Sequence, residues 1–201
     1  MPSPVGHTLA GLAISRLWSP SRSPVPPDWP STVAIVVAAN LPDIDTLFYF
    51  LGDRSSTLGW LAHRGPLHSL GAAAILATLV FVLLRPKGDR FAGRWAAILG
   101  MVYASHILLD FFNADPGLPR GVPIFWPISD AYHISPVTIF LNIEWRDTAT
   151  WITWHHLAAV MIEVLVLLPL VLIRRPRTGR PSTTTGPVPL PMSDTADNSA
   201  S

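Results

Sequence analysis

Three clusters of side chains that commonly bind metal ions stand in or beside hydrophobic stretches of this chain. They are the segments Asn40-Leu-Pro-Asp43-Ile-Asp45, His63-Arg-Gly-Pro-Leu-His68-Ser69 and His106-Ile-Leu-Leu-Asp110. Ionisable groups in apolar segments are costly to bury, so they are candidates for function, and each needs a partner. A metal ion is a partner that imidazoles and carboxylates can share. Because the chain has no cysteine, thiolate zinc sites, iron–sulfur clusters and disulfides are excluded.

His106 and Asp110 lie one helical turn apart, so a helix presents both on one face and a single ion can bind both. The alternative is a buried, hydrogen-bonded His–Asp pair that stabilises a helix bundle. The neighbouring residues 104–112 are mostly apolar, so an exposed polar face does not explain the pair. We expect both side chains to be metal ligands.

His63 and His68 cannot share one face of a regular helix, because five residues turn the helix face by about 140°. Gly65 permits unusual dihedral angles and Pro66 suits the first position of a new helix. His63 could therefore fold back towards His68 in the first helical turn, and both are candidate ligands. Arg64 would then offer a fixed cation to a phosphate or carboxylate, or it is simply an arginine at the membrane interface.

Asp43 and Asp45 follow Pro42, where a helix must break or restart. Acidic residues after a proline can cap a helix, but one carboxylate suffices for that role. Two carboxylates in an apolar segment indicate a bound cation, and either could bridge two ions. His7, near the N-terminal end of the first apolar stretch, is a further candidate ligand; the alternative is a histidine at the membrane interface.

The other histidines and acidic residues carry weaker signals. His155 and His156 stand beside Trp151 and Trp154, a pattern typical of the aromatic belt at a membrane interface. Glu163 lies seven residues beyond His156 and could pair with it or support the metal site, although helix packing is the favoured interpretation. Exposed loop positions are expected for Asp130, His133 and Glu144.

The composition indicates a membrane protein, whose apolar segments would position these clusters. Of 201 residues, 49% are hydrophobic and only 13% are charged. Residues 32–51, 67–84, 95–112 and 151–173 are long enough, or nearly so, to cross a bilayer core that needs about 20 residues; residues 5–18 are marginal. We predict an all-α, polytopic integral membrane helix bundle with about four or five transmembrane helices.

The basic residues orient this bundle. Ten of the fourteen lie within residues 16–22, 85–94 or 174–180, and these segments are therefore expected to be cytoplasmic. Five crossings with the N-terminus outside satisfy this pattern. Residues 52–66 and 113–150 then face outwards, and the longer loop is expected to carry short helices and fold over the bundle. All candidate ligands fall at the outer end.

Two regions follow from this topology. Residues 1–175 form a membrane-embedded metal-binding helical domain, and residues 176–201 form a disordered cytoplasmic tail, because they are rich in Pro, Ser and Thr.

The order and spacing of the motifs over roughly residues 5–130 resemble a bacterial family of predicted membrane-bound metal-dependent hydrolases, the YdjM-like inner-membrane proteins (DUF457). The segment Gly121-Val-Pro-Ile-Phe-Trp-Pro127 adds to the likeness. The family pattern often has threonine where this chain has Pro66. The resemblance implies a polytopic inner-membrane protein with a His/Asp metal centre. The residues that map onto this centre are His7, Asp43, Asp45, His63, His68, His106 and Asp110.

The hydrolase label of that family rests on a distant similarity to zinc-dependent phospholipase C and related nucleases. We therefore expect a metal-dependent hydrolase with one or more ions, Zn²⁺ first and Mn²⁺ second, because mixed imidazole and carboxylate ligands suit these ions. An activated water would attack a phosphoester or ester. Asp45 is the candidate base, and Arg64 would stabilise developing negative charge.

The expected partners are membrane lipids, with a lipid or lipid-linked phosphate as substrate, because the site opens at the bilayer surface. A net charge of +1 gives no indication of nucleic-acid binding. Two alternatives stay open: a metal-ion or proton transporter, and a non-catalytic membrane protein with a structural metal site. A centre saturated by protein ligands would favour the structural role.

Overall fold

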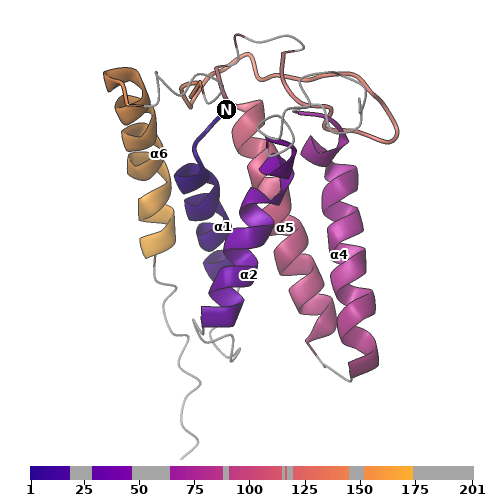
Figure 1. Cartoon of the computed structure of the whole chain (residues 1–201). Coiled ribbons are helices and arrows are strands. Elements are labelled where there is room, and N and C mark those ends of the chain that lie inside the picture. The colour runs from indigo at the N-terminus through magenta and orange to yellow at the C-terminus, as the bar shows by residue number, and fades with distance from the viewer. Residues whose placement is uncertain are drawn as a thin grey trace, which may run out of the picture.

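The computed structural model describes residues 1–18, 29–46, 64–87, 91–114, 116, 120–144 and 152–173. Across these ranges the chain forms five α-helices, three short 3₁₀ helices and no strand, which confirms the all-α prediction. The α-helices are α1 (Pro4–Trp18), α2 (Trp29–Asn40), α4 (Leu70–Leu84), α5 (Ala92–Phe111) and α6 (Trp154–Leu172) (Figure 1). The 3₁₀ helices are η1 (Leu41–Ile44), η3 (Pro66–His68) and η4 (Arg85–Lys87).

Helix α5 occupies the middle of the bundle. It packs against α1, α2 and α4, and α6 joins the bundle through α1 (Figure 1). Small and branched apolar side chains fill the contact between α2 and α5; the buried ones are Ile35, Ala38, Ala39, Ile98, Leu99 and Val102. This apolar cluster lies between the end of the bundle that carries the N-terminus and the opposite end, and it separates the two.

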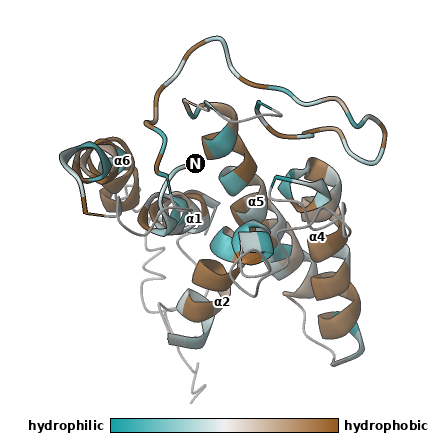
Figure 2. Cartoon of the chain, turned by 45° about the horizontal axis from the view of Figure 1, so that its top comes forward, coloured by the Kyte–Doolittle hydropathy of each residue, from teal (hydrophilic) through white to brown (hydrophobic). Residues whose placement is uncertain are grey.

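Two helices, α5 and α6, are long and apolar enough to cross a membrane by length and composition. Helix α4 is apolar but shorter, at 15 residues. Figure 2 shows hydrophobic residues along its length, and Ile75, Leu79 and Leu83 are exposed on its surface. The expectation of four or five membrane crossings stays a prediction.

The helix ends explain why the segments are shorter than their apolar stretches. Helix α2 ends at Asn40, two residues before Pro42, because proline lacks the N–H that an α-helix would need there. The Asn40 side-chain amide donates to the Val36 carbonyl at 2.9 Å. The chain continues as η1, so the predicted break is present and takes the form of a 3₁₀ turn.

The start of α4 differs from the prediction. Pro66 and His68 were expected in the first turn of this helix, but they form the separate turn η3, and α4 begins at Leu70. The Ser69 hydroxyl accepts a hydrogen bond from the Ala72 amide at 3.1 Å, so Ser69 is the N-cap. The Tyr103 hydroxyl of α5 donates to the Leu67 carbonyl at 2.6 Å and anchors η3 to the bundle.

Residues 120–144 fold over the end of the bundle where the N-terminus lies (Figure 1). They contain turns and an isolated bridge between Val122 and His133, and the predicted short helices do not occur in the part of this loop that the structure describes. A Cβ on Gly71 would lie 2.2 Å from the Trp126 carbonyl oxygen. Glycine therefore lets this loop approach the start of α4 closely.

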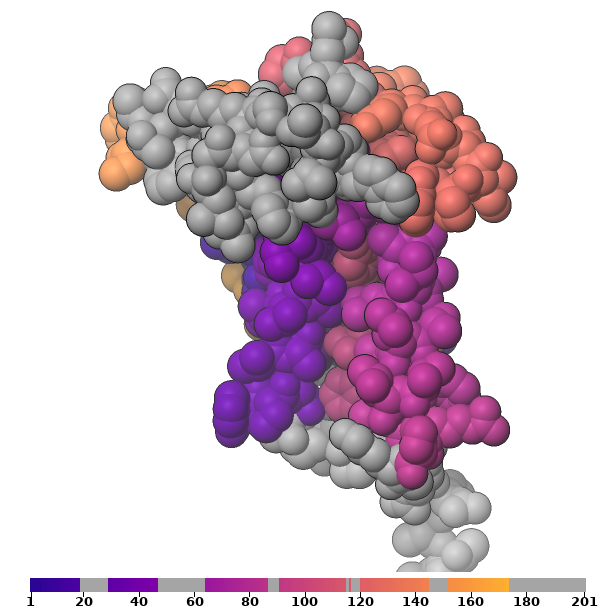
Figure 3. Space-filling view, turned by 45° about the vertical axis from the view of Figure 1, so that its right-hand side comes forward, coloured from indigo at the N-terminus to yellow at the C-terminus, as the bar shows by residue number. Residues whose placement is uncertain are grey.

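At the opposite end, α2 and α4 leave a groove of about 360 Å³ between them, with α5 at its floor (Figure 3). Its lining is almost entirely apolar and includes Ala34, Val80 and Leu99. The predicted tail, residues 176–201, lies outside the described residues.

Candidate metal centre

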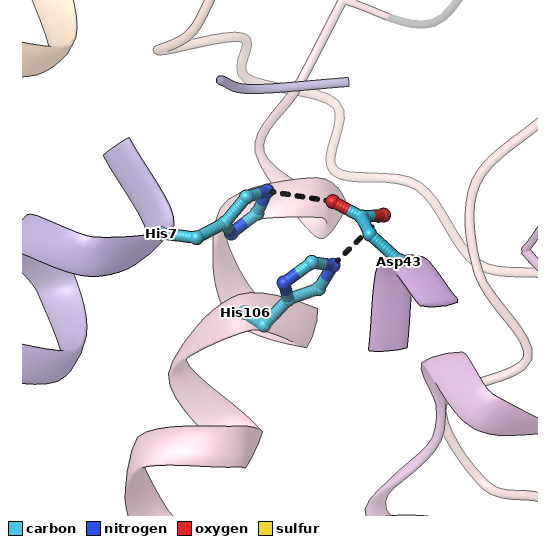
Figure 4. Close-up of side chains that lie close together, drawn as sticks. All are labelled: His7, Asp43 and His106. Atoms are coloured by element: carbon cyan, nitrogen blue, oxygen red, sulfur yellow. Dashed lines mark ion pairs between the residues drawn. The ribbon is translucent and has the colours of Figure 1, made fainter. Parts of the chain in front are cut away.

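Six of the predicted ligands come together at the end of the bundle covered by residues 120–144. His7 comes from α1, Asp43 from η1 and His68 from η3, while α5 supplies the remaining pair. Asp45 directly follows η1. Figure 4 shows His7, Asp43 and His106 pointing towards one another from three separate elements. His63 lies outside the described residues.

Four of these side chains place one donor atom each around a common point. The Nε2 atom of His68 lies 3.3 Å from Oδ1 of Asp43 and 3.5 Å from Oδ2 of Asp110. The Nε2 atom of His106 lies 3.5 Å and 3.3 Å from the same two oxygens, respectively. We call these four atoms the inner quartet.

The spacing of the inner quartet fits a metal ion. Four ligand atoms in a tetrahedron around Zn²⁺, at bonds of about 2.0–2.2 Å, lie about 3.3–3.6 Å from one another. The four measured separations of 3.3–3.5 Å fall in this range. The His68, His106 and Asp110 donor atoms all lie within 4.8 Å of one another.

The tautomer of His106 strengthens this interpretation. Its Nδ1 atom lies 2.8 Å from the Ala39 carbonyl oxygen, which can only accept a hydrogen bond, so Nδ1 carries the proton. In the neutral ring Nε2 then presents a lone pair to two carboxylate oxygens, and it makes no hydrogen bond. In this tautomer the neutral ring has no proton on Nε2 to donate to Asp110, 3.3 Å away, which disfavours the alternative of a hydrogen-bonded His–Asp pair.

Three of the four carboxylate oxygens of Asp43 and Asp110 lack a hydrogen-bond partner as well; the fourth, Oδ1 of Asp43, lies within hydrogen-bond distance of Nε2 of His68, at 3.3 Å. Asp110 is fully buried and neither of its oxygens accepts a hydrogen bond; Oδ2 of Asp43 is also without one. Buried charges without hydrogen-bond donors are strongly unfavourable, and they occur where they are paired or coordinate a metal. Imidazole nitrogens and carboxylate oxygens that face one another in a closed space indicate that this site fits a cation.

Asp45 lies behind His68 rather than within the inner quartet. Its Oδ2 atom is 3.5 Å from Nδ1 of His68 and accepts a hydrogen bond from the Arg64 amide at 3.1 Å. A carboxylate at the second ring nitrogen fixes the tautomer and orientation of a metal-binding histidine. The geometry thus suits Asp45 for orienting His68 better than for the predicted roles of bridging ligand or base.

Arg64 is buried and adopts a left-handed backbone conformation, with φ of 65°. This conformation is uncommon for a residue with a Cβ atom. It turns the chain immediately before Gly65, so that the Arg64 amide faces Asp45 and η3 can follow. The Arg64 backbone amide thus helps to hold Asp45 in its position beside His68.

His7 stacks on His106 with ring centroids 3.6 Å apart and an angle of 14° between the ring planes. Its Nε2 atom lies 4.0 Å from Oδ2 of Asp43 and 4.0 Å from Oδ1 of Asp110. The ring is fully buried and neither of its nitrogens makes a hydrogen bond. His7 therefore faces the oxygens that the inner quartet does not use.

The sequence profile of the YdjM inner membrane protein family matches residues 1–178, which include the whole centre. The chain is a member of this family. No curated protein and no solved structure matches it. The family description places this YdjM family member in the inner membrane.

One contact in this YdjM family member escaped the sequence prediction. Glu163 of α6 is fully buried, and it accepts hydrogen bonds from the amide of Ser3, at 2.8 Å, and from the Ser3 hydroxyl. The Ser3 hydroxyl also accepts from the Gly6 amide at 3.1 Å, so Ser3 is the N-cap of α1. Serine followed by Pro4 is an N-terminal helix signal and could have identified the cap, but not its partner 160 residues away.

Helix packing is the interpretation of Glu163 that the sequence favours, with pairing to His156 as an alternative, and Glu163 accepts hydrogen bonds from Ser3 of the N-terminal segment. His156 instead accepts a hydrogen bond from the Glu144 amide at 3.1 Å. His155 is exposed and its Nε2 atom lies 2.7 Å from the Asn142 carbonyl oxygen. Asp130 is exposed as expected, whereas Glu144 and His133 are half-buried. None of these groups belongs to the inner quartet.

Proposed function

We propose that this YdjM family member is an integral-membrane metal-dependent hydrolase. The observation that carries the proposal is the inner quartet, in which two imidazole nitrogens and two carboxylate oxygens meet at 3.3–3.5 Å, while Nε2 of His106 and both oxygens of Asp110 lack a hydrogen-bond partner. Mixed nitrogen and oxygen donors favour Zn²⁺, with Mn²⁺ next. When bound, such an ion acidifies a coordinated water and polarises a phosphoryl or carbonyl oxygen.

The residues around the ion have distinct tasks in this proposal. Asp43 is the one member of the quartet with measurable exposure, 12% of its side chain, so substrate approaches on its side. Asp45 holds the His68 ring in place. Arg64, buried next to Asp45, is the candidate cation for a phosphate or carboxylate group of the substrate.

A lipid or lipid-linked phosphate is the proposed substrate class. The family resides in the inner membrane, and the centre lies at one end of a bundle of largely apolar helices. An apolar cavity of about 430 Å³ lies along α5 beside the centre, and its lining includes Leu70, Ile107 and Ile124. A hydrocarbon chain in this cavity would lie on the membrane-facing side of α5, next to the loop that covers the centre.

The proposed orientation places the centre at the outer face of the membrane. Arg85 and Lys87 of η4 follow the C-terminal end of α4, whereas His68 precedes its N-terminal end. Basic residues favour the cytoplasmic side. The centre therefore lies on the opposite, extracytoplasmic side in a multi-pass arrangement.

A transport pathway is less well supported. It would need polar groups that continue from the centre towards the other end of the bundle. Directly below the centre lie Ala39 and Val102, both completely buried, within the apolar cluster between α2 and α5. Among the residues that the structure describes, this cluster gives an ion no ligands to follow.

A purely structural metal site is the stronger rival, because four protein ligands can saturate a tetrahedral ion. Measuring metal content and hydrolysis in the same preparations separates the two. Wild type, His106→Ala and the control His155→Ala would be purified in detergent and assayed for zinc and manganese. Each would then be assayed for cleavage of a nitrophenyl phosphodiester and of phospholipid in mixed micelles.

The proposal expects bound metal and hydrolysis in wild type and His155→Ala, and loss of both in His106→Ala. Metal without cleavage of any phosphoester or ester probe, including the phospholipids, would leave a structural site. Absence of metal after reconstitution with Zn²⁺ and Mn²⁺ would refute the centre itself.

A further inference from the structure

We infer that the centre binds two ions, the second held by His7 together with the oxygens of Asp43 and Asp110 that face away from the inner quartet. This inference rests on the proposed metal centre and extends it to a second site. The second site consists of Nε2 of His7, Oδ2 of Asp43 and Oδ1 of Asp110.

The stacking of the two histidines separates the ions. The donor lone pair of an imidazole lies in the plane of its ring, so an ion bound by the ring lies close to that plane. The planes of His7 and His106 are nearly parallel, at 14°, and their centroids are 3.6 Å apart. An ion in the plane of one ring is therefore well out of the plane of the other.

Distance alone would allow a single ion, because donor atoms of His7, Asp43 and His106 lie within 4.8 Å of one another. The ring orientation argues against that arrangement. Both rings point their Nε2 atoms towards the Asp43 carboxylate, side by side rather than towards one shared point (Figure 4). Two ions satisfy both lone pairs, whereas one ion satisfies only one.

The carboxylates divide their oxygens in the way that two ions require. Oδ1 of Asp43 faces His68 and His106, and Oδ2 faces His7. Oδ2 of Asp110 faces the same pair of histidines, and its Oδ1 faces His7. Each carboxylate thus offers one oxygen to each site and is placed to bridge them.

The second site is looser than the first. Nε2 of His7 lies 4.0 Å from each of its two oxygens, farther than the 3.3–3.5 Å between the nitrogens and oxygens of the inner quartet, so the second ion is expected to bind more weakly. It has three protein donors instead of four. Three protein ligands leave a coordination position for water or substrate, which is the arrangement typical of catalytic rather than structural metal sites.

The buried state of His7 supports a ligand role independently of the carboxylates. Its ring is completely buried, and neither nitrogen has a hydrogen-bond partner. A neutral imidazole in such a place leaves a donor and an acceptor unsatisfied. An ion at Nε2 would satisfy the acceptor on the side that faces the two carboxylates.

The test counts ions at equilibrium and asks whether they are neighbours. Detergent-purified wild type, His7→Ala and His155→Ala would be stripped of metal and titrated with Mn²⁺. Electron paramagnetic resonance of free Mn²⁺ reports the number bound, and the bound spectrum reports magnetic coupling between adjacent ions. His155→Ala removes an exposed imidazole and controls for loss of a histidine.

Two ions per chain are expected in wild type and His155→Ala, with a tight and a weaker phase and a coupled spectrum. His7→Ala is expected to retain the tight ion, which also shows that it folds, and to lose both the weaker ion and the coupling. A single ion in wild type throughout the titration, or two coupled ions in His7→Ala, would overturn the second site.

These outcomes separate the second site from the proposed function. One ion with phosphodiester cleavage would refute the second site and leave the hydrolase standing. Two coupled ions that depend on His7, without cleavage of any ester, would support the second site and refute the hydrolase. No bound Mn²⁺, with no Zn²⁺ taken up in parallel, would refute both.

Discussion

The replacement of Gly6 by alanine tests how α1 is held against α6. A Cβ atom on Gly6 would lie 2.6 Å from Oε2 and 2.8 Å from Cδ of Glu163. The carboxylate cannot move away freely, because it is fully buried and accepts two hydrogen bonds from Ser3. The new methyl group must therefore push α1 and α6 apart or break the contact with Ser3.

The expected magnitude follows from two opposing terms. Overpacking a buried contact costs about 1–3 kcal/mol, and alanine in a helix is better than glycine by about 0.5–1 kcal/mol. Gly6→Ala should therefore be destabilising by roughly 0–2.5 kcal/mol. The matched control is Gly93→Ala in α5, where the added Cβ would meet only Phe81 Cε2, at 3.9 Å. Gly93→Ala should be neutral or stabilising.

Thermal unfolding in detergent, followed by circular dichroism, measures both variants. Gly6→Ala should lower the melting temperature by a few degrees, whereas Gly93→Ala should leave it unchanged or raise it. In a Glu163→Ala background the clash is gone, so adding Gly6→Ala should no longer destabilise. If Gly6→Ala is as stable as Gly93→Ala in the wild-type background, the packing of α1 on Glu163 is wrong.

Three further predictions concern the metal centre. Asp110→Asn should abolish binding of both ions by elemental analysis, because Asp110 contributes to each site, whereas His155→Ala should bind normally; retained metal in Asp110→Asn would contradict the assignment. Metal removal by a chelator should lower the melting temperature of wild type but not of Asp110→Asn, since an ion at 100 times its dissociation constant stabilises a folded protein by about 2.7 kcal/mol. Asp45→Asn should weaken the tight ion about 10- to 100-fold in a calorimetric titration without changing the number bound, because Asp45 orients His68 rather than binding the ion; a lost ion would make Asp45 a ligand.

Much of the helix architecture was predictable from local patterns. Apolar stretches marked the five helices, and the break before Asp43 followed from the missing N–H of Pro42. The helix ends were harder to predict from the sequence, because each end depends on an individual capping residue. Ser69 ends the turn η3 and caps α4, so the helix starts three residues later than its apolar stretch suggests.

The roles of Asp43 and Asp45 illustrate the limit of a motif. Two residues apart, they are equivalent in the sequence, and both were expected to be ligands. A tight turn of about three residues rotates side chains two positions apart by about 240°. Asp43 consequently faces the centre and Asp45 faces the far side of His68.

The sequence by itself determined the donor types, the helical spacing of His106 and Asp110 and the apolar segments that carry them, because these depend on neighbours within a turn of helix. Only the tertiary structure decided that His7 stacks on His106, that Ala39 sets its tautomer and that Glu163 holds the start of α1. Each of these contacts joins helices distant in the chain, and their relative placement depends on packing that no local pattern encodes.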